Sequence, residues 1–272
     1  MQVIYIAGAS HSGSTLLDMM LNAHPDIIGV GELLHINRVL YSKSGKVKAT
    51  RCSCGAVGLL QCEFWSGVNQ RIEETTGKPM AELNVNDYRR GKGEHEANSV
   101  VFRAISEVSG KKFIVDSSKI PRRLQYLLQV EELNVYPIHL LRKPAGQIAS
   151  VISQYGLVKS IFYHEAVHAQ FRQMLKAIPH SVVWYEDLVA DPKGTLQRIL
   201  APAGLAFDPR QLSWAEQARH SFAGNHARLQ TKSELVMDQK WNDILTPTQK
   251  LLIKLGTFTS MHLSPKAKVT ER

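Results

Sequence analysis

Residues 8–15, Gly-Ala-Ser-His-Ser-Gly-Ser-Thr, form a candidate phosphate-binding loop. They follow the apolar run 3–7 and precede apolar residues spaced to cover one face of a helix. A strand, a glycine turn and a helix in this order aim backbone N–H groups and a positive helix end at one anion. Both glycines and Thr15 match the nucleoside-triphosphate loop, but Ser14 stands where that loop has its lysine. A kinase or GTPase without this lysine loses the charge that holds the β- and γ-phosphates, so the loop suits a different phosphate ester.

A second candidate phosphate-binding segment lies at residues 138–150. The run Ile-His-Leu-Leu-Arg at 138–142 predicts a strand that ends in Arg142, and residues 144–150 predict the start of a helix. Pro144 suits the first turn of that helix, where a missing N–H costs nothing. The guanidinium of Arg142 can donate two hydrogen bonds to phosphate oxygens, and Ser150 adds one hydroxyl from the second turn.

These two segments resemble the sulfotransferases that use 3'-phosphoadenosine-5'-phosphosulfate (PAPS). Ser-Gly-Ser-Thr-Leu-Leu at 12–17, Asn-Ala-His-Pro at 22–25 and Gly-Glu at 31–32 are similar to the start of the tyrosylprotein and carbohydrate type and its bacterial relatives. The resemblance is good over residues 3–42 and 113–260 and poor over 43–112. It implies that Arg142 and Ser150 bind the 3'-phosphate of PAPS. It also implies a binding site for the 5'-phosphosulfate made by five loop residues, His11, Ser12, Gly13, Ser14 and Thr15.

The resemblance implies a catalytic role for Lys119, which follows the apolar strand 113–116. Sulfotransferases place a basic or catalytic residue here, facing the transferred sulfuryl group. The alternative is a surface lysine at a helix start, where the helix dipole disfavours positive charge. The same strand also resembles the Walker B strand of nucleotide hydrolases, in which Asp116 would hold magnesium.

Glu32 is the candidate general base, because tyrosylprotein sulfotransferases use a glutamate in the matching Gly-Glu context. A carboxylate in a partly desolvated site should have its pKa raised toward working pH. The alternative is a carboxylate that caps a helix before residues 33–35. His11 is the third catalytic candidate. It stands where related loops have lysine or arginine, and a histidinium there could donate to the departing phosphate. Its alternative is a neutral histidine that hydrogen-bonds the loop.

Three later residues are assigned to the nucleotide by resemblance. Tyr185 follows the expected strand 181–184, where family tyrosines border the nucleotide, although it could equally be a core residue. Asn225 and Arg228 belong to the run Gly-Asn-His-Ala-Arg at 224–228, which resembles the C-terminal stretch that folds over PAPS.

The three cysteines of the chain, Cys52, Cys54 and Cys62, lie within eleven residues. Their closeness suggests zinc, but the spacing is not that of a zinc finger or ribbon, and no fourth ligand is nearby in the sequence. We therefore expect no metal site. The segment is expected to pack beside the acceptor pocket, with Phe64 and Trp65 as its anchors.

Composition and element order predict an α/β fold: a P-loop-like single domain with a central parallel sheet flanked by helices. The domain would span residues 1–263, with 43–112 as a variable acceptor-side or lid insertion (a mobile loop at 84–98) and 264–272 as a flexible basic tail. Strands are expected at 3–7, 27–30, 113–116, 136–141 and 181–184. Helices are expected at 14–23, 64–76, 97–109, 121–133, 145–156, 159–178, 193–203 and 247–259.

The charge pattern bears on possible partners. The 272 residues carry a formal charge of +9, and 44% are hydrophobic. The excess suits an anionic ligand such as PAPS, or it could serve solubility alone. The basic residues form no long run and no pattern with aromatics, so nucleic acid is not expected. Without an apolar stretch for export or for spanning a bilayer, the sequence predicts a cytoplasmic protein with no membrane contact.

The sequence thus predicts a sulfotransferase that moves a sulfuryl group from PAPS to a hydroxyl or amine of a small-molecule acceptor. Adenosine 3',5'-bisphosphate would leave, and no metal would be required. Two alternatives remain at this point: a P-loop kinase that uses ATP and magnesium through Thr15 and Asp116, and a catalytically inactive nucleotide-binding regulator.

Overall fold

The structure, a computed structural model, describes residues 1–40, 51–85 and 93–257, and for 93–95 the backbone alone. These residues form two compact units. The first unit contains Met1–Ile6, Thr15–Tyr136 and Phe207–Ser233, and the second contains Ala7–Ser14, Pro137–Ala206 and the chain from Glu234 onward. The expected tail at 264–272 and residues 86–92 of the expected mobile loop at 84–98 lie outside the described residues. Residues 93–98 of that expected loop instead form the first turns of a helix, α4 (Gly93–Ser109).

Five strands form one parallel sheet in the order β2-β3-β1-β4-β5. In the first unit β3 pairs with β1 on one side, with Ile4 opposite Val115, and with β2 on the other, with Ile28 opposite Ile114. In the second unit β4 pairs with β5, with Leu140 opposite Val183. The bounds are β1 Gln2–Ala7, β2 Ile27–Gly29, β3 Phe113–Asp116, β4 Asn134–Leu141 and β5 Ser181–Trp184.

The prediction of an α/β fold with a parallel sheet is confirmed, and each of the five predicted strands is present. Their sequences are short and almost continuously apolar because a parallel sheet is covered on both faces. Strand β1 illustrates this, since every residue from Val3 to Ala7 is at most 1% exposed.

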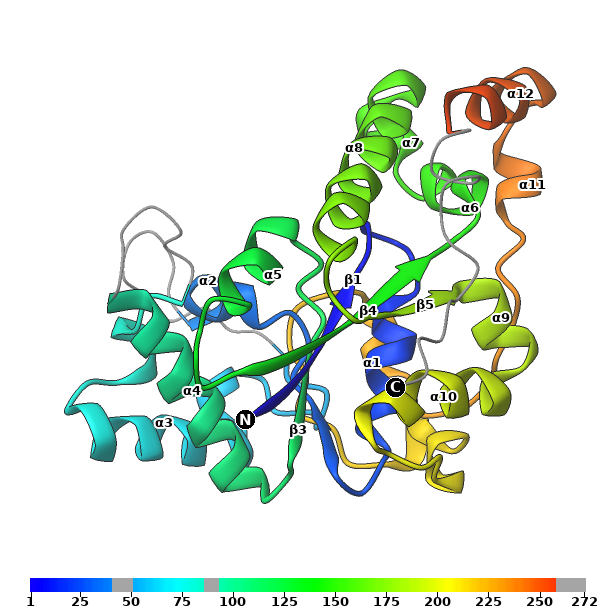
Figure 1. Cartoon of the computed structure of the whole chain (residues 1–272). Coiled ribbons are helices and arrows are strands. Elements are labelled where there is room, and N and C mark those ends of the chain that lie inside the picture. Colours follow the sequence, from blue (N-terminus) through cyan, green and yellow to red (C-terminus); the bar gives the residue numbers. More distant parts are fainter. Residues whose placement is uncertain (41–50, 86–92, 258–272) are drawn as a thin grey trace. The chain divides into compact units, whose positions relative to one another are not determined.

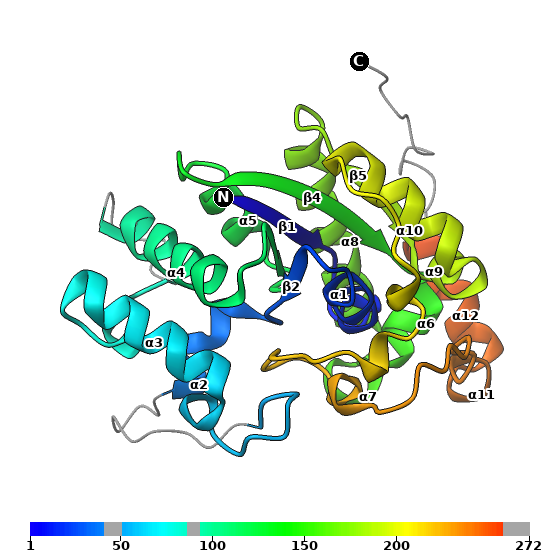
Figure 2. The same cartoon turned by 90° about the horizontal axis from the view of Figure 1, so that it is seen from below.

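In the first unit the long helices α3 and α4 lie side by side (Figure 1; Figure 2). Helix α3 buries Trp65, Val68 and Ile72, and α4 buries Phe102 and Ile105. This apolar pairing stabilises the segment between β2 and β3. The helices of this unit are α1 Ser14–Asn22, α2 Ile36–Leu40, α3 Glu63–Thr76, α4 Gly93–Ser109 and α5 Pro121–Leu127.

In the second unit α6 packs against both α8 and α12. A core of Ile148, Ala149, Leu245 and Ile253 holds this group together. Within the described part of the chain, no helix is long and apolar enough to cross a membrane. The helices are α6 Pro144–Ala149, α7 Ile152–Tyr155, α8 Leu157–Leu175, α9 Tyr185–Ala190, α10 Pro192–Leu200, α11 Trp241–Ile244 and α12 Pro247–Gly256.

The structure corrects several predicted helix boundaries. The helix expected at 145–156 is two short helices, because Val151 leaves the helical region at φ −126° and Gly156 ends α7 at φ 74°. The helix expected at 121–133 ends at Leu127, after which turns lead into β4. Residues 185–190, for which no helix was predicted, form α9. Pro144 does open α6, as predicted.

A buried ion pair fixes the end of β3. The Oδ2 atom of Asp116 accepts from Arg123 Nε at 2.7 Å, and both side chains are fully buried. The Oδ1 atom accepts from the backbone N–H of Ser118 at 2.9 Å and from its hydroxyl. Both carboxylate oxygens are therefore already engaged. This leaves Asp116 poorly placed for the magnesium contact of a Walker B aspartate.

This pair leads to a prediction about stability. Arg123→Met leaves the Asp116 carboxylate buried without its counter-charge, which should lower the free energy of unfolding by about 3–5 kcal/mol. Arg122→Met is the matched control, because the neighbouring arginine is exposed and its loss should cost about 0.5 kcal/mol or less. Urea unfolding measures both. Equal effects of the two substitutions would show that the buried pair does not stabilise β3.

Candidate functional site

The predicted strand, loop and helix are present, and two residues of the loop have left-handed backbone conformations. His11 has φ 64° and Gly13 has φ 91°, and α1 begins at Ser14. Left-handed residues interspersed in a loop turn successive backbone N–H groups toward one side, as in anion-binding nests. The hydroxyl of Ser12 is buried, and among the described residues it has no hydrogen-bond partner. The loop thus offers an unused donor of the kind that a phosphate or sulfate would take.

Close contact with Tyr185 explains why residue 13 is glycine. A Cβ atom at Gly13 would lie 2.5 Å from the Tyr185 ring, so the ring packs directly on the loop backbone. Tyr185 is the first residue of α9 and follows β5. Its hydroxyl lies 3.5 Å from the carbonyl of Val236. Tyr185 is therefore part of the wall of the loop, rather than a residue of a remote core.

Arg142 also contacts the loop, from the end of β4. Its Nη1 donates to the carbonyl of His11 at 2.8 Å, and its guanidinium carbon lies 4.7 Å from the centre of the Tyr185 ring. The side chain passes close over α6, since a Cβ at Gly146 would lie 3.0 Å from two guanidinium nitrogens. The second unit thus brings together the loop, Arg142 and Tyr185, which lie far apart in the sequence.

The Arg142 guanidinium already holds a carboxylate. Its Nη2 donates to Asp238 Oδ2 at 2.7 Å. Burial raises the pKa of Asp238, but the hydrogen bond and charge of Arg142 and the N–H of Lys240 outweigh it and lower the pKa overall. Sequence reasoning missed Asp238, because a single acid in a polar segment carries no pattern.

Two other residues of this unit complete the loop's surroundings. Ser150 is exposed at the C-terminal end of α6, and its hydroxyl donates to the carbonyl of Gly146 at 3.0 Å. Gln147, which sequence reasoning also missed, donates to the carbonyl of Ser10 at 2.9 Å. Its Oε1 lies 2.6 Å from Nδ1 of His164, whose pKa burial lowers to about 4. A neutral His164 can therefore orient Gln147, which in turn fixes the loop.

In the first unit the carboxylate of Glu32 contacts two side chains, those of Lys119 and His35. Its Oε1 accepts from Lys119 Nζ at 2.5 Å, and its Oε2 lies 3.2 Å from His35 Nε2. Glu32 is the residue before the 3-10 helix Leu33–His35, but its side chain makes no capping hydrogen bond. The alternative interpretation as a capping carboxylate therefore does not hold.

The pKa of Glu32 is opposite to the sequence-based expectation. Burial raises the pKa, as expected, but the hydrogen bond from His35 and the charge of Lys119 lower it more, to about 2. The sequence could not indicate the contribution of Lys119, because this lysine lies 87 residues from Glu32 and reaches it only through the fold. In this state Glu32 is a weak base.

Lys119 is held in a constrained conformation. Its φ is 61°, a left-handed value that is uncommon for a residue with a side chain. Besides Glu32, its Nζ donates to the carbonyl of Ser117 at 2.9 Å, and its side chain is 9% exposed. The alternative of a surface lysine therefore does not hold.

A buried acid missed by sequence reasoning lies beside Glu32. Asp18 is on α1, one turn after Thr15, and its Oδ2 accepts from the hydroxyl of Ser117 at 2.7 Å. Burial raises its pKa to about 7, against smaller lowering effects of Ser117 and Lys119. The available signal was a single acidic residue in the otherwise apolar run 16–21 of a predicted helix. Asp18, Thr15 and Glu32 line a cavity of about 10 Å³, close to the least volume that holds one water.

Arg228 lines the same cavity, while Asn225 has a structural contact. Arg228 is buried and donates to the carbonyl of Arg51 at 2.9 Å. Burial lowers the pKa of Arg228, and the nearby Cys52 and Glu32 act in the opposite direction. Asn225 caps the 3-10 helix His226–Leu229 by accepting from the N–H of Ala227 at 2.9 Å.

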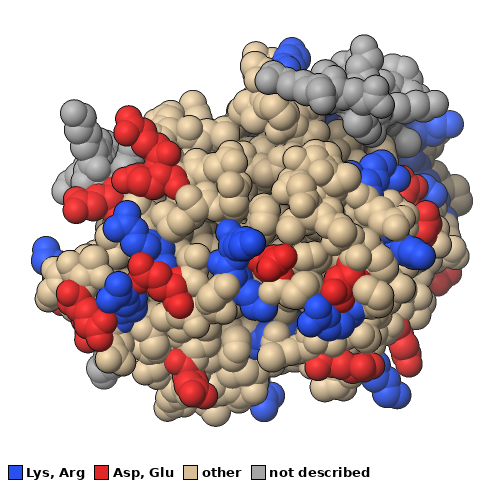
Figure 3. All heavy atoms as spheres, turned by 60° about the horizontal axis from the view of Figure 1, so that its bottom comes forward, with Lys and Arg blue, Asp and Glu red and all other residues tan. Residues whose placement is uncertain are grey.

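The surface charge agrees with the dispersed pattern of the sequence. On the face drawn in Figure 3, basic and acidic side chains are interspersed. That face therefore presents the mixed charge of an ordinary protein surface rather than an extended basic track.

The raised pKa of Asp18 predicts a pH dependence of stability. The folded state holds this proton more tightly than the unfolded chain, so stability should fall as pH rises from about 4 to about 7 and then level off. Asp18→Asn cannot ionise and keeps an acceptor for Ser117. At pH 8 the variant should be more stable than the wild type, on the order of a few kcal/mol, and at pH 4 about equal.

Urea unfolding at the two pH values tests this, with Asp243→Asn as an exposed control that should change stability equally at both. An unchanged pH dependence in Asp18→Asn would mean that Asp18 ionises at its ordinary pKa.

Comparison with known proteins agrees with this architecture. One similar structure is the sulfotransferase domain of the olefin synthase of Synechococcus PCC 7002, with a TM-score of 0.62 and 18% identity over 97% of this chain and 96% of that one. Another is the sulfotransferase domain from the curacin biosynthetic pathway, with a TM-score of 0.55 and 15% identity over 93% and 96%. A search of curated protein sequences found no match.

These structural likenesses show a shared fold, and the sequence itself shows the family. The model of the sulfotransferase family matches residues 3–209, which include the glycine loop, Glu32, Lys119, Arg142 and Tyr185. The match covers well over half of the 272 residues. The chain therefore belongs to the sulfotransferase family.

Proposed function

We propose that this protein transfers a sulfuryl group from PAPS to a hydroxyl or amine of a small-molecule acceptor. The observation that carries the proposal is the arrangement of Arg142. Its guanidinium is fixed against the lysine-less loop and against Tyr185, and it binds a carboxylate through Nη2. The loop can bind one phosphate of a nucleotide, and the guanidinium of Arg142, which here binds a carboxylate, can bind a second one. This arrangement suits a nucleotide that carries phosphates at both its 5' and its 3' position.

In this proposal the donor is bound by charge and backbone dipoles. The N–H groups of residues 12–15 and the free hydroxyl of Ser12 bind the 5'-phosphosulfate. Arg142 exchanges Asp238 for the 3'-phosphate, and Ser150 adds a hydroxyl after releasing its contact with the helix. Tyr185 borders the nucleotide. Asn225 and Arg228 belong to the stretch that the family resemblance assigns to the cover of PAPS.

The reaction itself needs positioning and charge neutralisation more than covalent catalysis. The acceptor oxygen or nitrogen attacks sulfur in line, and the bond between sulfur and the bridging oxygen breaks as adenosine 3',5'-bisphosphate leaves. Lys119 and His11 stabilise the charge that develops on the departing phosphate. The acceptor's proton passes to Glu32.

The ion pair of Glu32 and Lys119 gives the base a means of activation. While His35 and Lys119 are both hydrogen-bonded to Glu32, the pKa of the carboxyl is about 2. When Lys119 turns toward the sulfuryl group, Glu32 loses a counter-charge in a partly buried place, and its pKa rises. Donor binding would therefore strengthen the base when it is needed.

The two alternatives are weaker. A magnesium-dependent kinase would need Asp116 as a metal contact, but its two oxygens are occupied by Arg123 and Ser118. Such a kinase would also lack the loop lysine and leave Arg142 without a role. A regulator without catalysis would bind the nucleotide but turn over no acceptor, so acceptor screening with labelled PAPS distinguishes it from a transferase.

The first prediction from the proposed function concerns the 3'-phosphate of PAPS. Adenosine 3',5'-bisphosphate should raise the melting temperature without magnesium, and AMP, which lacks the 3'-phosphate, should do so much less. Arg142→Ala should weaken binding of the bisphosphate by about 2–3 kcal/mol, because a charge-assisted contact is lost. Asp238→Asn should strengthen it, because a competing carboxylate is removed.

Calorimetric or thermal-shift titration measures these affinities, with Lys143→Ala as the control. Lys143 is the exposed neighbour of Arg142 and carries the same charge. Unchanged affinity in Arg142→Ala would place the 3'-phosphate elsewhere. Stabilisation by ATP only with magnesium would instead support the kinase.

The second prediction concerns Glu32. Glu32→Gln keeps the size of the side chain but cannot accept the proton, so turnover should fall about 10²–10⁴-fold with little change in donor affinity. Because the pKa of Glu32 in the free protein is about 2, this group should cause no loss of kcat/KM between pH 5 and 8 in the wild type. Steady-state kinetics test both points, with an acceptor that the screen has shown to be sulfated.

Glu63→Gln is the control for the Glu32 variant, because it makes the same change on an exposed residue. If Glu32→Gln keeps near-normal turnover but melts at a lower temperature, the carboxylate only anchors Lys119, and another group takes the proton.

A further inference from the structure

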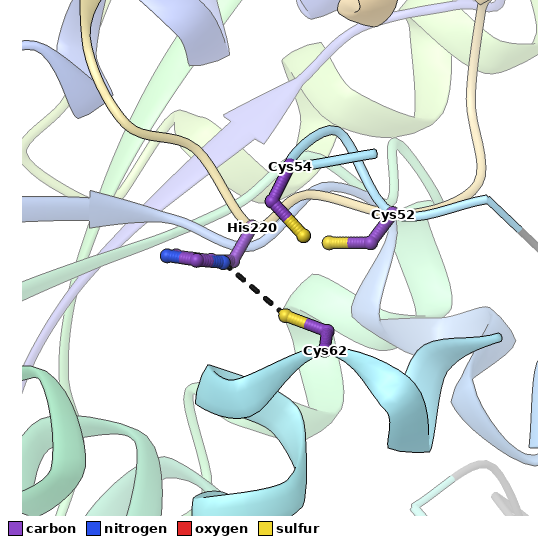
Figure 4. Close-up of side chains that lie close together, drawn as sticks. All are labelled: Cys52, Cys54, Cys62 and His220. Atoms are coloured by element: carbon purple, nitrogen blue, oxygen red, sulfur yellow. Dashed lines mark hydrogen bonds between the residues drawn. The ribbon is translucent and has the colours of Figure 1, made fainter. Parts of the chain in front are cut away.

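The three cysteines meet a histidine from a distant part of the first unit. Figure 4 shows the side chains of Cys52, Cys54, Cys62 and His220 directed toward one another. Their four donor atoms all lie within 4.8 Å of one another, and Cys62 Sγ is 3.2 Å from His220 Nδ1. The expectation of no metal rested on the lack of a fourth ligand near the cysteines. The fold brings one from 158 residues away.

We propose that these four residues, the Cys3His cluster, bind one Zn²⁺ ion. Three thiolates and one imidazole are a common ligand set for structural zinc, and soft sulfur donors favour zinc over magnesium or calcium. Tetrahedral bonds of about 2.3 Å to sulfur and about 2.0–2.1 Å to nitrogen separate the donors by about 3.6–3.8 Å. The observed separations require only small side-chain movements to reach that geometry.

The backbone around Cys52 and Cys54 is shaped as a tight turn. The N–H of Gly55 donates to the carbonyl of Cys52 at 3.0 Å, and the N–H of Cys52 donates to the carbonyl of Ala56 at 2.8 Å. Gly55 has φ 101°, a conformation that a residue with a side chain rarely adopts. This turn directs both sulfurs to the same side, where Cys62, at the start of α3, faces them.

His220 is held in its orientation by aromatic neighbours. Its ring stacks on Phe64 with the centroids 5.0 Å apart and the planes at 24°. Nε1 of Trp65 donates to the carbonyl of His220 at 2.5 Å, and the Trp65 ring packs edge-on against Phe222. A metal ligand whose ring and backbone are both fixed loses little freedom on binding. Phe64 and Trp65, expected to anchor the cysteine segment, thus support this cluster.

The charges around the cluster and its accessibility from solvent also suit zinc. Three thiolates and Zn²⁺ leave one net negative charge, and the nearby cation Arg228 interacts with Cys52. Cys52 and Cys62 are buried, whereas Cys54 is exposed and leaves a path from solvent. Four protein ligands fill a tetrahedral site, so the ion would be structural and not a catalytic Lewis acid.

A zinc ion in the Cys3His cluster would also affect the backbone beside Glu32. His220 directly precedes the segment that contacts Gly31, and Phe222 pairs with Gly31 in an isolated bridge. The backbone N–H of Ser53 donates to the carbonyl of Ser221 at 3.0 Å, and the N–H of Ser221 donates to the hydroxyl of Ser53 at 2.9 Å. Zinc would therefore fix residues 220–224 against residues 51–62 and, through Gly31, hold the backbone beside Glu32.

Metal analysis of the full chain tests the proposal. Protein purified under reducing conditions should contain about one zinc per chain, and a strong chelator should remove it. Removal should lower the melting temperature by several degrees and expose three thiols to a thiol reagent, and added Zn²⁺ should reverse both changes. Replacement by Co²⁺ should give the absorption of a tetrahedral, thiolate-bound ion, which needs no variant.

Two variants identify the ligands. His220→Ala and Cys62→Ser should hold zinc at least tenfold more weakly against a competing chelator, while His226→Ala should hold it as the wild type does. His226 is an exposed histidine in the same part of the chain. The proposal is overturned if the zinc-reconstituted wild type binds no stoichiometric metal, if His220→Ala retains wild-type affinity, or if the thiols form a disulfide that excludes zinc. None of these measurements depends on sulfotransfer activity. A negative result would therefore contradict the zinc proposal and leave the proposed function unaffected.

Discussion

Close approach to glycine backbone is the constraint on which both groups of candidate residues depend. In the second unit the Tyr185 ring lies where a side chain at Gly13 would be, and the Arg142 guanidinium lies in tight contact, at 3.0 Å, with the place of a Cβ at Gly146. In the first unit a Cβ at Gly31 would lie 2.4 Å from the carbonyl of Phe222. A larger residue at Gly13, Gly146 or Gly31 would move the Tyr185 ring, the Arg142 guanidinium or the backbone beside Glu32, respectively. The positions of the candidate residues therefore depend on glycine at these three positions.

Three acidic residues of the first unit, Asp116, Glu32 and Asp18, show how the fold gives carboxylates different properties. Asp116 has a dedicated arginine and serves structure. Glu32 has Lys119 and His35, and its pKa falls to about 2. Asp18 has a hydroxyl partner and more distant charges, and burial raises its pKa to about 7. Counter-charge and burial, rather than the carboxylate itself, decide which acid can exchange a proton.

The second unit uses a carboxylate in another way. Asp238 binds the guanidinium that the family resemblance assigns to a phosphate, and this contact keeps Arg142 paired and oriented. A buried arginine without a partner would be costly, and under the proposed function a phosphate that replaced Asp238 would meet a guanidinium already held by His11 and Tyr185. This preorganisation lowers the cost of ordering the site on binding.

The sequence by itself determined the local features: the five strands, the glycine loop, the proline start of α6 and the α/β class. These depend on apolar runs, glycine and proline, whose effects act within a few residues. It also identified Glu32, Lys119, Arg142 and Tyr185 as candidates, because family motifs preserve residue type and spacing.

Only the tertiary structure decided what these residues contact. It paired Glu32 with Lys119 and His35, which reversed the expected pKa shift, and it placed Asp238 on Arg142. It also brought His220 to the cysteines. These contacts join segments separated by three to more than 150 residues, and their strength depends on distance and burial. Neither distance nor burial is encoded in local spacing, so the lowered pKa of Glu32 and the position of His220 beside the cysteines became visible only in the fold.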